Sequence, residues 1–180
     1  DSHDSMVHAD GRLAEPPIAL SEVQGYVYLA KTRMADVYRA LGRPEDAGRL
    51  EDEAERLKVR FNEAFWMEDE RYFAAALDAR KQQLRTLMSN PGHCLYSGIV
   101  DEDKALPLAK RLLAPDMFSG WGARTMSRSA ASYNPMSYHN GSVWPHDNAL
   151  IAAGLKRYRF ARATNRVATA LFDAAVSADY

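Results

Sequence analysis

Residues 21–64 read SEVQGYVYLAKTRMADVYRALGRPEDAGRLEDEAERLKVRFNEA, and this stretch carries the strongest structural signal in the chain. Apolar residues recur in it at spacings of three and four, which is the period of one face of an α-helix. The first stripe consists of Val23, Val27, Ala30, Met34, Val37 and Leu41, and the second of Leu50, Ala54, Leu57, Phe61 and Ala64. Gly42 suits a helix end, and Pro44 suits a first helical turn. Two helices joined by so short a turn must lie antiparallel as an αα-hairpin.

The remainder of the chain favours further helices separated by polar segments. Helices are expected over residues 102–113, 142–158 and 160–178, with Asp101 as a cap for the first and Asn140 or Ser142 for the second. A short strand is expected over residues 71–77, where two aromatic residues favour extended backbone. The sequence therefore predicts an all-α protein.

Two irregular stretches, residues 1–17 and 114–141, hold most of the unusual polar residues. Loops longer than about 12–15 residues are uncommon inside a compact domain and are often functional. All five histidines fall in or beside irregular segments, and none lies on an apolar helical stripe. We therefore expect the helices to form a scaffold and the loops to form the functional site.

Composition excludes several classes of function. The 180 residues are 47% hydrophobic and 26% charged, which is typical of a globular protein with a core. A net charge of −1, with both signs interspersed, argues against a nucleic-acid or membrane partner. No apolar run approaches the roughly 20 residues of a membrane span, and no signal-peptide pattern is apparent. The single Cys94 fits a reducing compartment, so a cytoplasmic location is expected.

Residues 137–148 read Ser-Tyr-His-Asn-Gly-Ser-Val-Trp-Pro-His-Asp-Asn and hold the most distinctive chemistry. Imidazole, carboxamide and carboxylate groups form hydrogen bonds with hydroxyls, and an indole ring covers the apolar face of a sugar. The side chains that supply this set are Tyr138, His139, Asn140, Trp144, His146 and Asp147. The segment predicts a site for a polyhydroxylated ligand, with Trp144 and His139 as the first candidates for contact.

Residues 1–11 read Asp-Ser-His-Asp-Ser-Met-Val-His-Ala-Asp-Gly and combine three carboxylates with two imidazoles. As a metal site the segment lacks any familiar ligand spacing. It is otherwise either a solvated polar loop or a loop that carries a catalytic acid, and the residues alone leave both interpretations open.

Five strings, taken in order, resemble one family. They are Asp-Ser-x-Asp-Ser…His-Ala-Asp-Gly at residues 1–11, Glu-Val-Gln-Gly-Tyr at 22–26, Asn-Pro-Gly-His at 90–93, Phe-Ser-Gly-Trp-Gly-Ala-Arg-Thr at 118–125 and Tyr-x-x-Gly-x-Val-Trp at 138–144. Together they resemble the bacterial glycogen-debranching, amylo-α-1,6-glucosidase-like glycoside hydrolases. The resemblance implies a partial (α/α)6 toroid of helical hairpins. It also implies that residues 1–180 are one piece of a larger catalytic domain, truncated at both ends.

The resemblance implies an inverting hydrolase of α-glucan that uses no cofactor. It places the general acid at Asp1, with Asp4 as the alternate. It implies sugar binding by His8, Asp10, Glu22, Gln24, His93, Trp121, Tyr138, His139, Asn140, Trp144 and His146. The family's general base is a glutamate that follows the Val-Trp motif. Because no glutamate follows Glu102, the base is expected beyond Tyr180, although Asp147 and Asp173 are alternatives.

The resemblance leads to two expectations and leaves two alternative functions open. The isolated fragment should be inactive, and it should expose apolar helix faces through which it self-associates. A sugar epimerase on the same toroid is an alternative, with His93 and His139 as acid and base. A non-catalytic glucan-binding module is the other alternative, since a fold does not by itself fix a function.

Overall fold

The computed structural model describes residues 4–179, and most of this segment is helical. The helices are α1 (Ser21–Ala40), α2 (Pro44–Ala64), α3 (Pro91–Ser97), α4 (Glu102–Leu112), α5 (Pro145–Arg157) and α6 (Ala161–Ser177). The expectation of an all-α protein is confirmed, with a few two-residue strands added. No helix in the described part of the chain is both long and apolar enough to cross a membrane.

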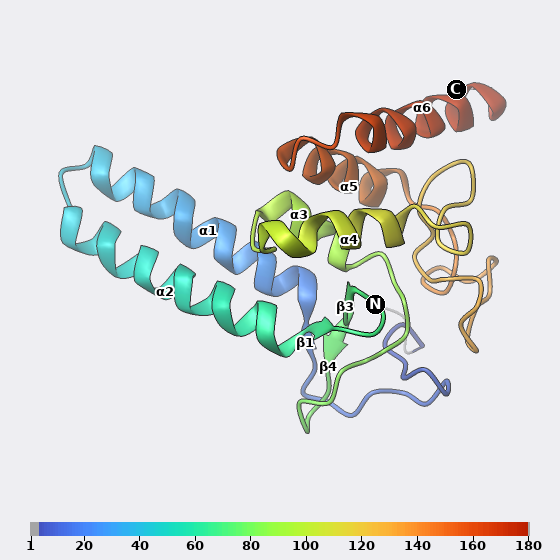
Figure 1. The fold of residues 1–180 in the computed structure, drawn as a ribbon, viewed down its shortest axis with the longest axis horizontal. Helices are drawn as coiled ribbons and strands as arrows, with labels where there is room; N and C mark the ends of the chain where they lie inside the picture. The colour runs from blue at the N-terminus through green and yellow to red at the C-terminus, as the bar shows by residue number, and fades with distance from the viewer. Residues whose placement is uncertain (1–3, 180) are drawn as a thin grey trace.

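The helices form two long hairpins on either side of a central pair (Figure 1). The predicted hairpin of α1 and α2 is confirmed, and Gly42 turns the chain between them with a φ of +71°. A second hairpin joins α5 to α6 through residues 158–160. The short helix α3 packs against both α1 and α5, so it lies between the two hairpins. The starts of α1, α3 and α5 therefore meet near the centre of the molecule.

The strands are shorter and differently paired than the sequence indicates. β1 (Ala19–Leu20) pairs antiparallel with β4 (Ala76–Leu77), and β2 (Trp66–Met67) pairs with β3 (Tyr72–Phe73). The single strand expected over residues 71–77 is therefore wrong: its two halves belong to different two-stranded sheets. The backbone between β3 and β4 forms a hydrogen bond outside both sheets, because the Ala75 carbonyl accepts the N–H of Ser21 at the start of α1.

The start of one helix differs from expectation, and one helix was not expected at all. α5 begins at Pro145 and not at residue 142, because Val143 forms an antiparallel bridge with Arg124 and keeps that backbone extended. Trp144 therefore occupies the N-cap position, and neither Asn140 nor Ser142 caps the helix. α3 was not predicted, because its seven residues are too few to show a helical period.

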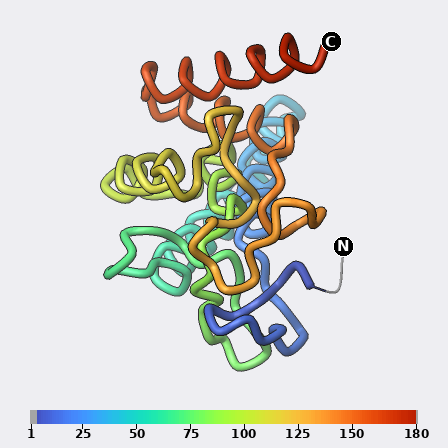
Figure 2. Tube along the Cα trace, turned by 90° about the vertical axis from the view of Figure 1, so that its right-hand side faces the viewer, coloured from blue at the N-terminus to red at the C-terminus, as the bar shows by residue number. Residues whose placement is uncertain are grey.

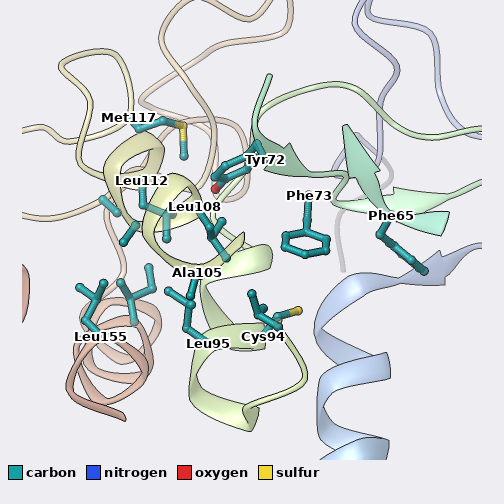
Figure 3. Packing of buried hydrophobic residues seen from close by; sticks show 14 of the residues in the cluster. Phe65, Tyr72, Phe73, Cys94, Leu95, Ala105, Leu108, Leu112, Met117 and Leu155 are labelled. Carbon is teal, nitrogen blue, oxygen red and sulfur yellow. The ribbon is translucent and has the colours of Figure 1, made fainter. Parts of the chain in front are cut away.

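The main core lies between α3, α4, α5 and the short strands (Figure 3). Leu95, Leu108, Leu112 and Leu155 are fully buried there, and each such side chain contributes roughly 1.5–3 kcal/mol through its removal from water. Tyr72 is also fully buried, and its hydroxyl donates to the Met88 carbonyl at 2.7 Å. This bond ties the strand layer to the segment that leads into α3.

The N-terminal loop and the long loop before α5 meet on one side of the helices; in Figure 2 the blue N-terminal loop lies beneath the orange one. The Asn140 amide donates to the Asp4 carboxylate at 3.0 Å across this contact. The long loop is held at its other end by Arg111, whose two guanidinium nitrogens donate to Asp116 at 2.7 Å each. This pairing holds the pKa of Asp116 well below its usual range. Two segments far apart in the sequence thus form one surface.

The apolar stripe of α1 is largely exposed in this chain. Val23, Val27, Met34 and Val37 keep 40–46% of their surface accessible, whereas the buried residues of α1 are Ser21, Gly25 and Ala35. An exposed apolar helix face was expected, and it is present here. Self-association through this face stays a prediction.

Close packing of α3 against its neighbours depends on two glycines. A Cβ at Gly25 of α1 would lie 2.7 Å from the Ser97 hydroxyl, and one at Gly154 of α5 would lie 2.5 Å from the Tyr96 backbone nitrogen. Side chains other than hydrogen at these positions would push α1 or α5 away from α3.

We expect Gly154→Ala to lower the free energy of unfolding by about 1–3 kcal/mol, because the helix-propensity gain is smaller than the cost of the clash. The matched control is Gly48→Ala on α2, where an added Cβ meets nothing within 4 Å. That variant should be more stable by about 0.5–1 kcal/mol. Urea unfolding of both variants measures the difference. Equal behaviour of the two would contradict the packing argument.

Candidate functional site

A cavity of about 130 Å³ opens where the starts of α1, α3 and α5 meet the two loops. Its volume is well below the roughly 300–1,000 Å³ typical of drug-sized ligands, which favours a small ligand. It is lined by Ser5, Met6, Glu22, Met88, Ser89, Asn90, His93, Thr125, His139, Trp144, His146 and Asp147. Three histidines, two carboxyl groups and an indole therefore converge on one small space.

A larger groove of about 580 Å³ runs along α4 and is more open. Its lining mixes acidic, basic and aliphatic side chains and includes no histidine and no aromatic residue. Because unusual chemistry gathers in the smaller cavity, we assign the functional site there and not to the groove.

Glu22 lies in the first turn of α1 and faces the cavity. The Asn90 amide donates to its Oε1 at 2.9 Å, and the Ser21 hydroxyl lies 3.4 Å from its Oε2. Burial raises the pKa of this carboxyl, and the hydrogen bond from Asn90 offsets only part of that effect. Glu22 therefore keeps its proton to a higher pH than a glutamate in water.

A hydrogen-bonded chain of three side chains crosses from α1 through α3 to α5. The Tyr26 hydroxyl bonds to Nδ1 of His93, and Nε2 of His93 bonds to Oδ1 of Asp147. Burial, followed by the nearby charge of Glu22, raises the pKa of Tyr26 to about 12, so this phenol keeps its proton. Both ring nitrogens of His93 are therefore engaged with protein groups.

Aromatic and imidazole rings form a cluster at the opposite wall. The Trp144 ring centroid lies 4.6 Å from that of Tyr138, 4.9 Å from that of His139 and 5.3 Å from that of His146. Burial lowers the pKa of His139, which favours its neutral form. Such a cluster offers a flat apolar surface edged by nitrogens, which suits the face and hydroxyls of a sugar ring.

The structure brings together part of the predicted site. Glu22, His93, His139, Trp144 and His146 line the cavity. Tyr138 packs on Trp144, and Asn140 is buried and holds Asp4 beside the cavity residue Ser5. Asp1 lies outside the described residues.

Four other predicted residues lie outside the cavity lining. His8 faces Asp78 at 3.6 Å, and Asp10 accepts hydrogen bonds from Arg12 at the surface. Gln24 donates to the Leu20 carbonyl of its own helix start, and Trp121 is 49% exposed. The sequence strings therefore identified segments near the cavity, but not which of their side chains line it.

Sequence reasoning also missed some cavity residues. Asn90 immediately precedes Pro91 at the start of α3, and an asparagine–proline pair of this kind is a signal for a helix start that was available. Ser5 and Thr125 belong to two of the matching strings but were not singled out as site residues, and Met88 carries no signal of its own. Within residues 4–179, no group of three or more His, Cys, Asp or Glu side chains is arranged to hold a metal ion.

The division between a helical scaffold and a site made of loops holds only in part. His93 and His146, which the sequence placed in or beside irregular segments, lie in α3 and α5. Both belong to the first turns of their helices, where the chain has just left a loop. The cavity is therefore walled by helix starts as well as by the two loops.

Comparison with solved structures shows the fold. Mannosylglycerate hydrolase of Thermus thermophilus, a GH63 enzyme in complex with Tris, is 17% identical over 89% of this chain, with a TM-score of 0.75. The same enzyme in complex with glucose is 16% identical over 89% of this chain, with a TM-score of 0.74. Neutral trehalase of Saccharomyces cerevisiae is 16% identical over 98% of this chain, with a TM-score of 0.77. The chain spans 38%, 38% and 35% of these three structures, so its fold is part of an α/α toroid.

None of the curated proteins compared with the sequence matches it significantly. A family model does match, over residues 4–179, and that model describes the mannosylglycerate hydrolase MGH1-like glycoside hydrolase domain. The expected relationship to α/α-toroid glycoside hydrolases is confirmed, whereas the relationship to the glycogen-debranching group in particular is not. With nearly all of its described residues matched, the chain belongs to the MGH1-like family of glycoside hydrolase domains.

Proposed function

We propose that the protein containing this chain hydrolyses α-glucosidic bonds with inversion, and that this chain supplies the sugar-binding wall and the general acid. The observation that carries the proposal is the small cavity in a glycoside hydrolase domain, where the partly buried Glu22 and the Trp144 ring cluster line the same space. Among α-glucosidic substrates we favour the 1,6-linked branch of a glucan, on the resemblance of the five sequence strings.

Cleavage of a glycosidic bond requires an acid that protonates the leaving oxygen and a base that activates water. Inverting enzymes hold these two carboxyl groups roughly 6.5–9.5 Å apart, which leaves room for the water. We assign the acid to Asp4, because Asn140 fixes its carboxylate beside the cavity residue Ser5. Asp1, at which the sequence resemblance placed the acid first, lies outside the described residues and is kept as the alternate. We place the base on a carboxylate outside residues 4–179, since Asp147 is already bonded to His93 and Asp173 is exposed on α6.

The structural neighbours supply two competing substrates. They include a mannosylglycerate hydrolase and a trehalase, and one of these structures holds glucose. Mannosylglycerate and trehalose are therefore the substrates to assay beside isomaltose, panose and limit dextrin. An epimerase that uses His93 as acid or base is disfavoured, because both nitrogens of that ring are bonded to protein groups.

The test is sugar release by the full-length protein from the five substrates, with the anomeric form of the first product followed by proton NMR. We expect release from at least one α-glucoside with inverted configuration. Asp4→Asn should lower kcat by about 10²–10⁴-fold, the usual contribution of a general acid. Asp52→Asn on the exposed surface of α2 is the matched control and should leave kcat unchanged.

Three results would overturn this proposal. The first is that a folded full-length protein releases no sugar from any of the five substrates. The second is retention of the anomeric configuration, which would require a different mechanism. The third is full activity of both Asp4→Asn and Asp1→Asn. Exchange of solvent deuterium into a free hexose would point to the epimerase instead.

A second prediction concerns Glu22 and stability. Burial raises its folded-state pKa, so the folded state binds the proton more tightly than the unfolded state does. The stability associated with this proton is present below the unfolded pKa and is lost as the pH rises through the folded pKa. We therefore expect Glu22→Gln to be more stable than the native protein at pH 8, by about 0.5–2 kcal/mol, the range of typical stabilising substitutions.

This difference should shrink as the pH falls below the unfolded pKa of 4.5, where the carboxyl becomes protonated in both states. The same variant should lose at least about tenfold in kcat/KM, because it lacks the charged form that binds hydroxyls strongly. Urea unfolding at pH 8 and at acid pH measures the first effect, and steady-state kinetics the second. A Glu22→Gln protein that is less stable than the native protein at pH 8 would refute the argument.

A further inference from the structure

Among the described residues, Asp147 has a partner for only one of its carboxylate oxygens. It is the third residue of α5, it lines the cavity, and it is 4% exposed. Oδ1 is bonded by His93, whereas the buried Oδ2 has no hydrogen-bond partner among residues 4–179. The neighbouring residues Trp144 and His146, from the same helix start, line the same cavity.

An unpartnered buried oxygen of this kind is costly. Leaving a buried acceptor unsatisfied costs about 1–3 kcal/mol, and more when the group is charged. The N-terminus of α5 favours a negative charge and offsets part of this cost, but it does not give Oδ2 a hydrogen bond. Native structures rarely keep such a group without a reason, and a ligand is one such reason. Because Asp147 lies in the cavity wall, a molecule bound in the cavity can supply the hydrogen-bond donor that Oδ2 lacks.

His93 explains how the carboxylate is held. A carboxylate can only accept, so Nε2 of His93 carries the ring N–H and donates to Asp147. In the neutral ring, Nδ1 then accepts a hydrogen bond from the Tyr26 hydroxyl. The chain therefore runs in one direction, from Tyr26 through His93 to Asp147. Its three members lie on α1, α3 and α5, whose spacing is set by the close contacts at Gly25 and Gly154.

We propose that Asp147 accepts a hydrogen bond from one hydroxyl of a bound hexopyranose through Oδ2, and that His93 and Tyr26 are positioning residues that orient it. Asp147 is then a specificity-determining residue of the cavity. His93, which the sequence suggested as a sugar ligand, acts through Asp147 and not on the sugar. The inference rests on the proposed function for the class of ligand, but it requires only binding and no hydrolysis.

The test is calorimetric binding of glucose and mannose, and of their deoxy analogues, to the full-length protein and to Asp147→Asn. If the variant keeps its Oδ1 bonded to His93, its amide nitrogen replaces Oδ2, so a donor stands where an acceptor was. The native protein should bind a hexose and lose about 10- to 150-fold in affinity for one deoxy analogue, the range for a hydrogen bond to a charged group. Asp147→Asn should bind the parent sugar correspondingly weakly and should not distinguish it from that analogue.

Tyr26→Phe is the second variant, and it removes only the hydroxyl of a half-exposed residue. We expect it to weaken binding several-fold for the parent sugar, with a smaller loss for the same deoxy analogue, because a loosened His93 orients Asp147 less well. Asp52→Asn on α2 and Tyr96→Phe on α3 are matched controls at exposed positions, and both should bind as the native protein does.

Failure of the native protein to bind either hexose would overturn the proposal. So would an Asp147→Asn variant that keeps the native sensitivity to every deoxy analogue. If Asp147→Asn does not fold, unchanged hexose binding by Tyr26→Phe would by itself overturn the proposal. Failure of the proposed function gives a different result. A protein that binds hexose with the expected dependence on Asp147 and Tyr26, but releases no sugar, would contradict the hydrolase proposal and leave this inference unaffected.

Discussion

The close approach of α3 to α1 and α5 is the constraint on which the rest of the structure depends. Glycines at positions 25 and 154 leave no room for a side chain between these helices, so their starts are held within one small volume. Glu22, His93 and Asp147 are carried on those starts. Any widening of the helix spacing would separate them. The scaffold therefore determines the positions of these side chains through close backbone packing.

The site also carries features that oppose stability. Glu22 is partly buried and its pKa is raised by that burial, and Asp147 has a carboxylate oxygen without a partner within the described residues. Both cost free energy in the unliganded chain, and the apolar core around Tyr72 and Leu108 offsets that cost. Destabilising features of this kind are typical of ligand-binding sites, because the same groups contribute to affinity or rate when a ligand is bound. The exposed stripe of α1 is a separate feature and contributes nothing to this site.

Much of the fold was accessible from the sequence because it rests on local rules. The hairpin of α1 and α2 follows from two apolar stripes and from Gly42 and Pro44 between them. The short α3 was missed, because seven residues are too few to show a period. The start of α5 was misplaced, because a bridge between Arg124 and Val143, distant in sequence, keeps that backbone extended. Tertiary contact overrode local propensity there.

The sequence by itself determined the helical class, the relationship to toroid glycoside hydrolases and the two loops that border the site, because periodicity and motif strings are properties of neighbouring residues. The tertiary structure alone decided which side chains face the cavity. Trp121 and Gln24 belong to matching strings yet do not line the cavity, whereas Asn90 and Asp147 gained roles through partners 68 and 54 residues away. Side-chain direction depends on how helices pack in three dimensions, and no pattern along the chain encodes that geometry.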